Sequence, residues 1–151
     1  MKRWSKLQKS LYNLVDPEMK FQIHCSVFQT RSSWVTKRGK GQESVPRYWI
    51  TIGKEVVWDF PEMFLDREVI CVYGSHKIQM TLRDAYYMRS QYKWIGNTIR
   101  AYIHTPRTDL LTVDFTEDNY GLVDIFRAVD RRIGKEKRKP YIEALYRNET
   151  R

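Results

Sequence analysis

The spacing of apolar residues changes near residue 81, and this change is the strongest constraint on the fold of the chain. Between residues 21 and 80, apolar residues alternate with polar ones or form short compact runs, a pattern typical of β-strands. From residue 82 onward, apolar residues recur every three to four positions, as they do on one face of a helix. The clearest helical stripe contains Leu122, Ile125, Phe126, Val129 and Ile133.

These patterns predict one helix, then a set of strands, then several helices. The predicted strands cover residues 21–28, 48–52, 56–58, 68–73 and 77–80. The predicted helices cover about 4–15, 82–93, 121–133 and 136–147, with a short helix capped by Asn97 and a turn of helix at 107–112. This order predicts an α+β domain with an N-terminal helix, an antiparallel sheet of about four to five strands, and C-terminal helices packed on one face.

The length and composition predict a single globular domain. The chain has 151 residues, of which 42% are hydrophobic and 14% aromatic, so it has ample material for a core. The domain is expected to span 1–151, and the sequence leaves open whether residues 136–151 form a loosely attached helical tail. Because the basic N-terminus is not followed by an apolar segment, we expect no signal peptide, no membrane span and a cytoplasmic location. The sequence does not predict an oligomeric state.

The excess of positive over negative charge is confined to three segments of the chain. The net charge is +9, made up of +3 in residues 1–20, +4 in 31–47 and +5 in 131–151, whereas residues 48–130 carry −3. Localised positive charge attracts a polyanion or an acidic protein surface more strongly than dispersed charge does. The two favoured partners are therefore a nucleic acid and an acidic protein.

Nucleic-acid binding through phosphates is the favoured functional hypothesis. Basic residues beside an aromatic ring suit neutralisation of the backbone together with base stacking. We hypothesise that the 31–40 loop and the 131–139 segment lie on one side of the fold and form a single basic surface. The candidate residues are Arg31, Trp34, Lys37, Arg38, Lys40, Arg131, Arg132, Lys135, Arg138 and Lys139.

Two other functions remain open, a protein-interaction or regulatory module for an acidic partner and an enzyme of unknown type. No CxxC or HExxH motif and no phosphate-binding loop is present, so we predict no metal site, no cofactor and no catalytic residue. Cys25 and Cys71 each lie in an apolar strand pattern, which predicts unreactive thiols. Asp124 and Asp130 are expected to pair with Arg127 and Arg131 along the 121–133 helix.

Several stretches of the sequence together resemble a family of small uncharacterised bacterial cytosolic proteins. These stretches are residues 3–9, 22–25, 46–51, 99–106 and 130–135. The resemblance implies a bacterial, single-domain protein. The family has no established activity, so the resemblance implies no catalytic or binding residue.

Overall fold

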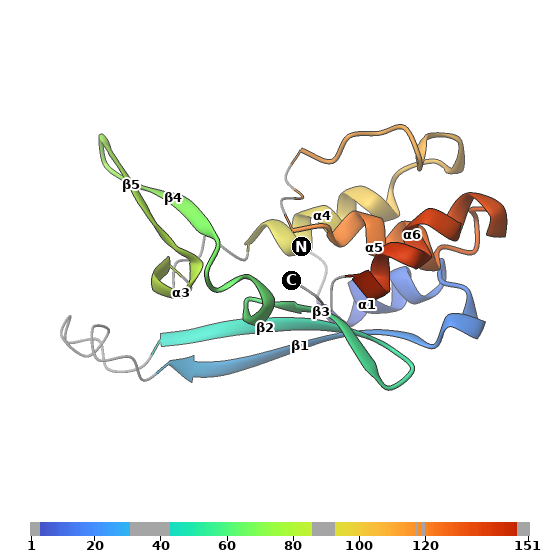
Figure 1. Ribbon diagram of the computed structural model, residues 1–151, viewed down its shortest axis with the longest axis horizontal. Coiled ribbons are helices and arrows are strands. Elements are labelled where there is room, and N and C mark those ends of the chain that lie inside the picture. Colours follow the sequence, from blue (N-terminus) through green and yellow to red (C-terminus); the bar gives the residue numbers. More distant parts are fainter. Residues whose placement is uncertain (1–3, 31–42, 86–92, 117, 119, 148–151) are drawn as a thin grey trace. The chain divides into compact units, whose positions relative to one another are not determined.

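A computed structural model describes residues 4–30, 43–85 and 93–147, apart from 117 and 119, and it has the predicted α+β class (Figure 1). An N-terminal helix precedes five strands, and further helices follow them. The strands form two antiparallel sheets rather than the single sheet that the sequence predicts. One sheet has the order β1-β2-β3, and the other pairs β4 with β5.

The bounds of the elements are as follows. Helix α1 covers Trp4–Tyr12, and the strands are β1 (Phe21–Thr30), β2 (Glu43–Ile52), β3 (Glu55–Phe60), β4 (Glu68–Tyr73) and β5 (His76–Thr81). The later helices are α3 (Leu82–Ala85), α4 (Lys93–Ile103), α5 (Leu122–Val129) and α6 (Lys135–Arg147). Three short 3-10 helices are η1 (Pro17–Met19), η2 (Glu62–Phe64) and η4 (Arg107–Asp109).

The internal contacts divide the chain into two compact units. Unit 1 contains residues 1–23, 49–58 and 94–151, and unit 2 contains residues 24–48 and 59–93. The strands of the β1-β2-β3 sheet contribute residues to both units. A single domain over 1–151 stays a prediction.

Helix α5 forms the centre of the core of unit 1. Phe126 is fully buried, and its ring lies 6.4 Å from that of Phe21 in β1 and 5.2 Å from that of Tyr102 in α4. The predicted apolar stripe therefore packs against the first strand. Trp58 links β3 to the segment just before α5, because its Nε1 donates to the carbonyl oxygen of Tyr120 at 3.0 Å.

Helix α5 is shorter than the predicted helix over 121–133. It ends at Val129, because Asp130 adopts an extended conformation with φ −73° and ψ 118°. Ile133 is buried nevertheless, with 5% of its surface exposed, so its agreement with the helical spacing is a coincidence. At the other end, the Asp118 carboxylate accepts hydrogen bonds from the backbone N–H groups of Leu122 and Val123. These bonds satisfy two of the donors that a helix start leaves free.

Helix α6 is a packed element of unit 1. Its Leu145 is 2% exposed and its Arg138 is 4% exposed, so the part of residues 136–151 that the structure describes is held against the core. Gly134 lies just before the start of α6, and its carbonyl oxygen accepts hydrogen bonds from the N–H groups of Lys137 and Arg138.

Two other predicted boundaries are wrong. Strand β2 begins at Glu43 rather than near residue 48, and it contains Pro46. Helix α4 begins at Lys93, so Asn97 lies inside it instead of capping it, and the Asn97 side chain accepts a hydrogen bond from Arg100. Of the predicted helix over 82–93, residues 86–92 lie outside the described part of the chain.

Unit 2 contains the β4–β5 hairpin. Gly74 makes the turn between the strands with a φ of 60°, a conformation that glycine adopts without strain. Helix α3 follows β5 directly, and the Thr81 hydroxyl donates to the Asp84 carboxylate at 3.2 Å. Elsewhere in this unit, Arg47 and Asp59 form a two-pronged ion pair that includes a 2.9 Å bond from Nε.

Candidate nucleic-acid interface

The ten predicted binding residues fall into two groups. Arg31, Trp34, Lys37, Arg38 and Lys40 lie within 31–42, outside the described residues. The other five lie between the end of α5 and the middle of α6. The hypothesis that both groups share one surface therefore stays a prediction, and the geometry below concerns the second group alone.

A short backbone bridge holds the junction between α5 and α6 against the end of α1. Val15 and Asp130 form an isolated antiparallel bridge. The N–H of Asp16 donates to the carbonyl oxygen of Val129 at 2.7 Å, and the N–H of Arg131 donates to that of Leu14 at 2.8 Å. This bridge ends α5 and fixes the direction in which the following arginines leave the backbone.

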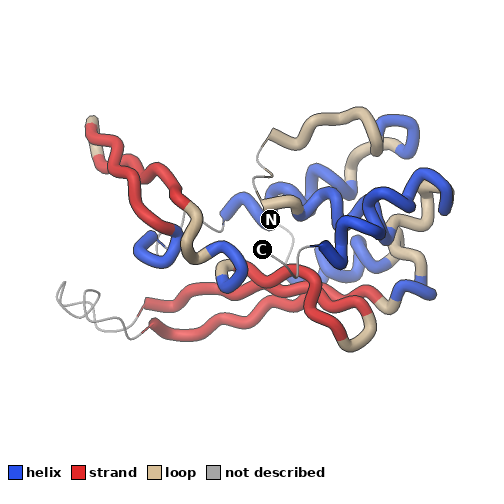
Figure 2. The backbone as a smooth tube through the Cα atoms, in the orientation of Figure 1, coloured by secondary structure: helices blue, strands red, loops and turns tan. Residues whose placement is uncertain are grey.

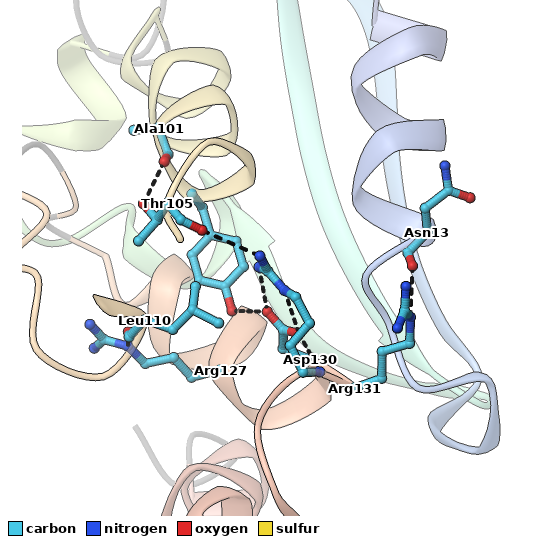
Figure 3. Close-up of polar contacts among 9 residues, drawn as sticks. Asn13, Ala101, Thr105, Leu110, Arg127, Asp130 and Arg131 are labelled. Atoms are coloured by element: carbon cyan, nitrogen blue, oxygen red, sulfur yellow. Dashed lines mark hydrogen bonds and ion pairs between the residues drawn. The ribbon is translucent and has the colours of Figure 1, made fainter. Parts of the chain in front are cut away.

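Asp130 is the centre of a buried polar cluster at this junction (Figure 3). Its carboxylate is 1% exposed and accepts a 2.6 Å hydrogen bond from the Tyr102 hydroxyl. Arg132 binds the same carboxylate through Nη2 at 2.8 Å and Nε at 3.1 Å, and its Nη1 donates to the carbonyl oxygen of Thr105 at 3.3 Å. The pairing expected along the helix is therefore wrong for Asp130, whose partner is Arg132 rather than Arg131.

The cluster shifts the pKa values of its members. Burial and the adjacent Asp130 carboxylate raise the pKa of Tyr102, so its hydroxyl stays protonated and donates to Asp130. Burial is the largest single effect and opposes the charge of Arg132, but the hydrogen bonds to Asp130, the charge of Asp130 and the smaller contribution of Tyr102 together outweigh it and raise the pKa of Arg132. Arg132 is therefore a permanently charged internal partner of Asp130, and its guanidinium is engaged within the protein.

Arg138 is also an internal residue. It is 4% exposed, and its Nη2 donates to Asp16 Oδ2 at 3.1 Å. Among the described residues, its Nε and Nη1 have no hydrogen-bond partner. The Asp16 carboxylate also accepts a 3.0 Å bond from the backbone N–H of Glu18. This backbone bond, together with Arg138, lowers the pKa of Asp16 despite its partial burial.

The pKa of Asp16 leads to a prediction about acid stability. Because the folded pKa lies below the ordinary value of 3.8, ionised Asp16 stabilises the fold at neutral pH, and this stabilisation is lost as the pH falls through the folded pKa. Asp16→Asn should therefore lower the free energy of unfolding at pH 7 and lose this difference from wild type at strongly acidic pH. Urea unfolding of both proteins across this range measures the difference. A difference that does not change with pH would contradict the assignment.

The remaining three candidates face solvent. Arg131 is exposed, and its Nε donates to the carbonyl oxygen of Asn13 at 2.9 Å. The side chains of Lys135 and Lys139 are 77% and 63% exposed. Their ammonium groups lie 3.8 Å from Glu18 and 3.1 Å from Glu136 respectively. Such exposed pairs contribute at most about 1 kcal/mol, so a phosphate can compete for these cations.

Sequence reasoning missed the Tyr102–Asp130–Arg132 cluster, although the sequence contains a signal for it. Asp130 follows Phe126 by four positions, which places a carboxylate in register with the apolar stripe of α5. A buried carboxylate requires a charged or hydrogen-bonding partner. By contrast, the predicted pair of Asp124 with Arg127 is confirmed, with Nη1 and Oδ1 3.1 Å apart.

Arg127 holds the segment between α4 and α5 in addition to pairing with Asp124. Its Nε donates to the carbonyl oxygen of Leu110 at 2.9 Å, and its Nη2 donates to that of Val113 at 3.0 Å. Its guanidinium also lies 5.8 Å from the centre of the Phe115 ring. Arg127 therefore organises the 110–115 segment and is not an accessible cation of the interface.

The two cysteines have less acidic thiols than usual. Cys71 is 2% exposed, and burial raises the pKa of its thiol. Cys25 is half-buried, and burial raises its pKa against a smaller opposing effect of a hydrogen bond with Tyr48. A raised pKa reduces the thiolate fraction that a nucleophilic role requires.

Neither a cluster of metal ligands nor a membrane span occurs in the described part of the chain. Over these residues, no three His, Cys, Asp or Glu side chains gather into a group that could hold a metal ion. None of the described helices has both the length and the apolar composition needed to cross a bilayer.

Comparison with known proteins assigns the chain to a family. The model of the SF0329 protein family matches residues 3–147, which is most of the chain, and this match confirms the predicted membership of an uncharacterised family. No curated protein and no solved structure matches the chain.

Proposed function

We propose that this chain, which belongs to the SF0329 protein family, binds the phosphate backbone of nucleic acids beside the start of α6. The cations that would make the contacts are called the junction patch and are Arg131, Lys135 and Lys139. The observation that carries the proposal is the distribution of the carboxylates. Asp130 and Asp16 bind Arg132 and Arg138 inside the protein, whereas the junction patch is exposed.

The positions on α6 indicate which lysines can act together. Successive residues of a helix are about 100° apart around its axis, so Lys135 and Lys139 lie on the same side of α6. Lys137 is rotated by about 200° from Lys135 and lies on the other side of the buried Arg138. Arg131 and Lys135 both contact the 13–18 segment, through Asn13 and Glu18. The junction patch is therefore a local surface that excludes Lys137.

The test is fluorescence anisotropy with a mixed-sequence oligonucleotide over a range of salt concentrations. Wild type should bind with an affinity that falls log-linearly with salt. The Lys135→Glu, Lys139→Glu double variant should bind at least about tenfold more weakly, with a salt slope smaller by about 2 for duplex DNA. Both lysines are exposed, so the variant should fold normally, which thermal unfolding checks.

A matched pair of single variants separates the junction patch from net charge alone. Lys135→Glu and Lys137→Glu change the total charge equally, but only Lys135 belongs to the patch. Equal weakening by both variants would contradict a defined patch, and no binding by wild type at low salt would reject the proposal altogether. Polyglutamate serves as a second ligand, because tighter binding to it than to the oligonucleotide would favour an acidic protein partner.

A further inference from the structure

The β4–β5 hairpin presents an apolar face to solvent. Ile70 and Val72 are 64% and 63% exposed, the highest values among the exposed large hydrophobic residues of the described chain. They lie on the same face of β4, since residues two apart in a strand point the same way. Their cross-strand partners in β5 are Gln79 and Lys77. Figure 2 shows the two paired strands joined by a short turn.

The other face of the hairpin is covered at Cys71, which lies between the two exposed residues and is only 2% exposed. Its cross-strand partner Ile78 is 42% exposed, less than Ile70 and Val72. A continuous apolar run such as Val69–Ile70–Cys71–Val72 is typical of a strand buried on both faces. The sequence of β4 therefore predicts that the face with Ile70 and Val72 is covered as well, and the described residues do not cover it. Isolated two-stranded sheets are at best marginally stable in water, so such a layer would stabilise the hairpin.

The charges on this face indicate what covers it. The register places Glu68 opposite Thr81 at one end of the face and Lys77 opposite Val72 at the other end. Glu68 and Lys77 are therefore separated by about 13 Å along the strands, too far to pair within one hairpin. The face consists of a negative end, an apolar middle around Ile70 and a positive end.

We propose that the exposed hairpin face is the contact surface of a homodimer, with a second copy of the same face as its partner. A two-fold interface uses one self-complementary patch twice. Antiparallel stacking of two such faces brings Ile70 against its counterpart and the Glu68 end of each copy against the Lys77 end of the other. The face has one cation, Lys77, and one carboxylate, Glu68, which would repel a phosphate. A nucleic acid is therefore a poor partner for this face. This inference does not depend on nucleic-acid binding by the junction patch.

The size of the face limits the strength of the dimer. Stable complexes bury about 800 Å² on each partner, more than the face of a hairpin with six-residue strands offers. The dimer should therefore be reversible, with a dissociation constant in the micromolar range or weaker. Sedimentation velocity of the full chain over a wide concentration range should show an average mass that rises from that of the 18.3 kDa monomer toward twice this value.

Substitutions test the apolar centre of this face. Ile70→Thr keeps a β-branched side chain in the strand but removes apolar surface, and this variant should remain monomeric at every concentration. The control is Val113→Thr, which makes the same type of change at an exposed residue of unit 1 and should dimerise like wild type. Equal dimerisation of the Ile70 variant and wild type would overturn the proposal, as would a wild-type mass independent of concentration.

A charge-swap cycle tests the antiparallel arrangement independently of hydrophobicity. Glu68→Lys and Lys77→Glu should each weaken dimerisation, because each places like charges at both ends of the contact. The double variant should restore it, since the two charges have only exchanged places. Both residues are exposed, so their replacement should leave the monomer folded. Failure of the double variant to recover dimerisation would exclude this arrangement.

Discussion

Phe126→Ala is expected to lower the free energy of unfolding by about 3–5 kcal/mol, because it leaves a cavity at the centre of unit 1. The ring is fully buried and lies between Phe21 of β1 and Tyr102 of α4. Neither neighbour can refill the space without moving its own backbone element. Urea unfolding followed by tryptophan fluorescence measures the loss.

The control for this prediction is Val113→Ala. Val113 is 37% exposed, and its truncation should change the stability by no more than about 0.5 kcal/mol. A cost below about 1 kcal/mol for Phe126→Ala would mean that α5 does not pack on β1 as described.

Asp130→Ala is the second substitution with a large expected effect, again about 3–5 kcal/mol. It removes the buried carboxylate that accepts hydrogen bonds from Tyr102 and Arg132. The guanidinium of Arg132 would then lack its counter-charge in a part-buried position, and the Tyr102 hydroxyl would lose its acceptor. Thermal or urea unfolding measures the cost.

Two further variants show whether the cost comes from the unpaired charge. Asp124→Ala removes a 59% exposed carboxylate, while Arg127 keeps its bonds to the carbonyl oxygens of Leu110 and Val113, so this variant should cost at most about 1 kcal/mol. Asp130→Ala combined with Arg132→Met removes both charges, and this double variant should be more stable than Asp130→Ala alone. If Asp130→Ala costs no more than Asp124→Ala, the cluster is not a determinant of stability.

The strand pattern of the sequence predicted the hairpin well because it depends on local features. The run Glu68–Tyr73 and the glycine that follows it define β4 and its turn without reference to the rest of the chain. The end of α5 was predicted poorly, because it depends on the bridge between Asp130 and Val15. The residues around 130 contain no local pattern that predicts pairing with Val15, which lies more than a hundred residues earlier.

The candidate interface shows the same division between local and distant information. The charge count identified 131–139 as a basic segment, but it could not separate the buried arginines from the exposed cations. That separation depends on Asp16, which is 122 positions from Arg138. The predicted partner of Asp130 was Arg131 rather than Arg132. That prediction assumed a helix that continues through residue 133, whereas α5 ends at Val129.

The pairing of Asp16 with Arg138 has a consequence for how the chain is made. Ribosomes add about 5–20 residues per second, so about 6–24 s pass between the synthesis of these two residues. During that time the segment that follows α1 has neither the bridge between Val15 and Asp130 nor the ion pair between Asp16 and Arg138. The hydrogen bonds of Gln8 and Tyr12 with Ile23 of β1 can form early, whereas the contacts of residues 14–16 with the junction between α5 and α6 form only after that junction has been made.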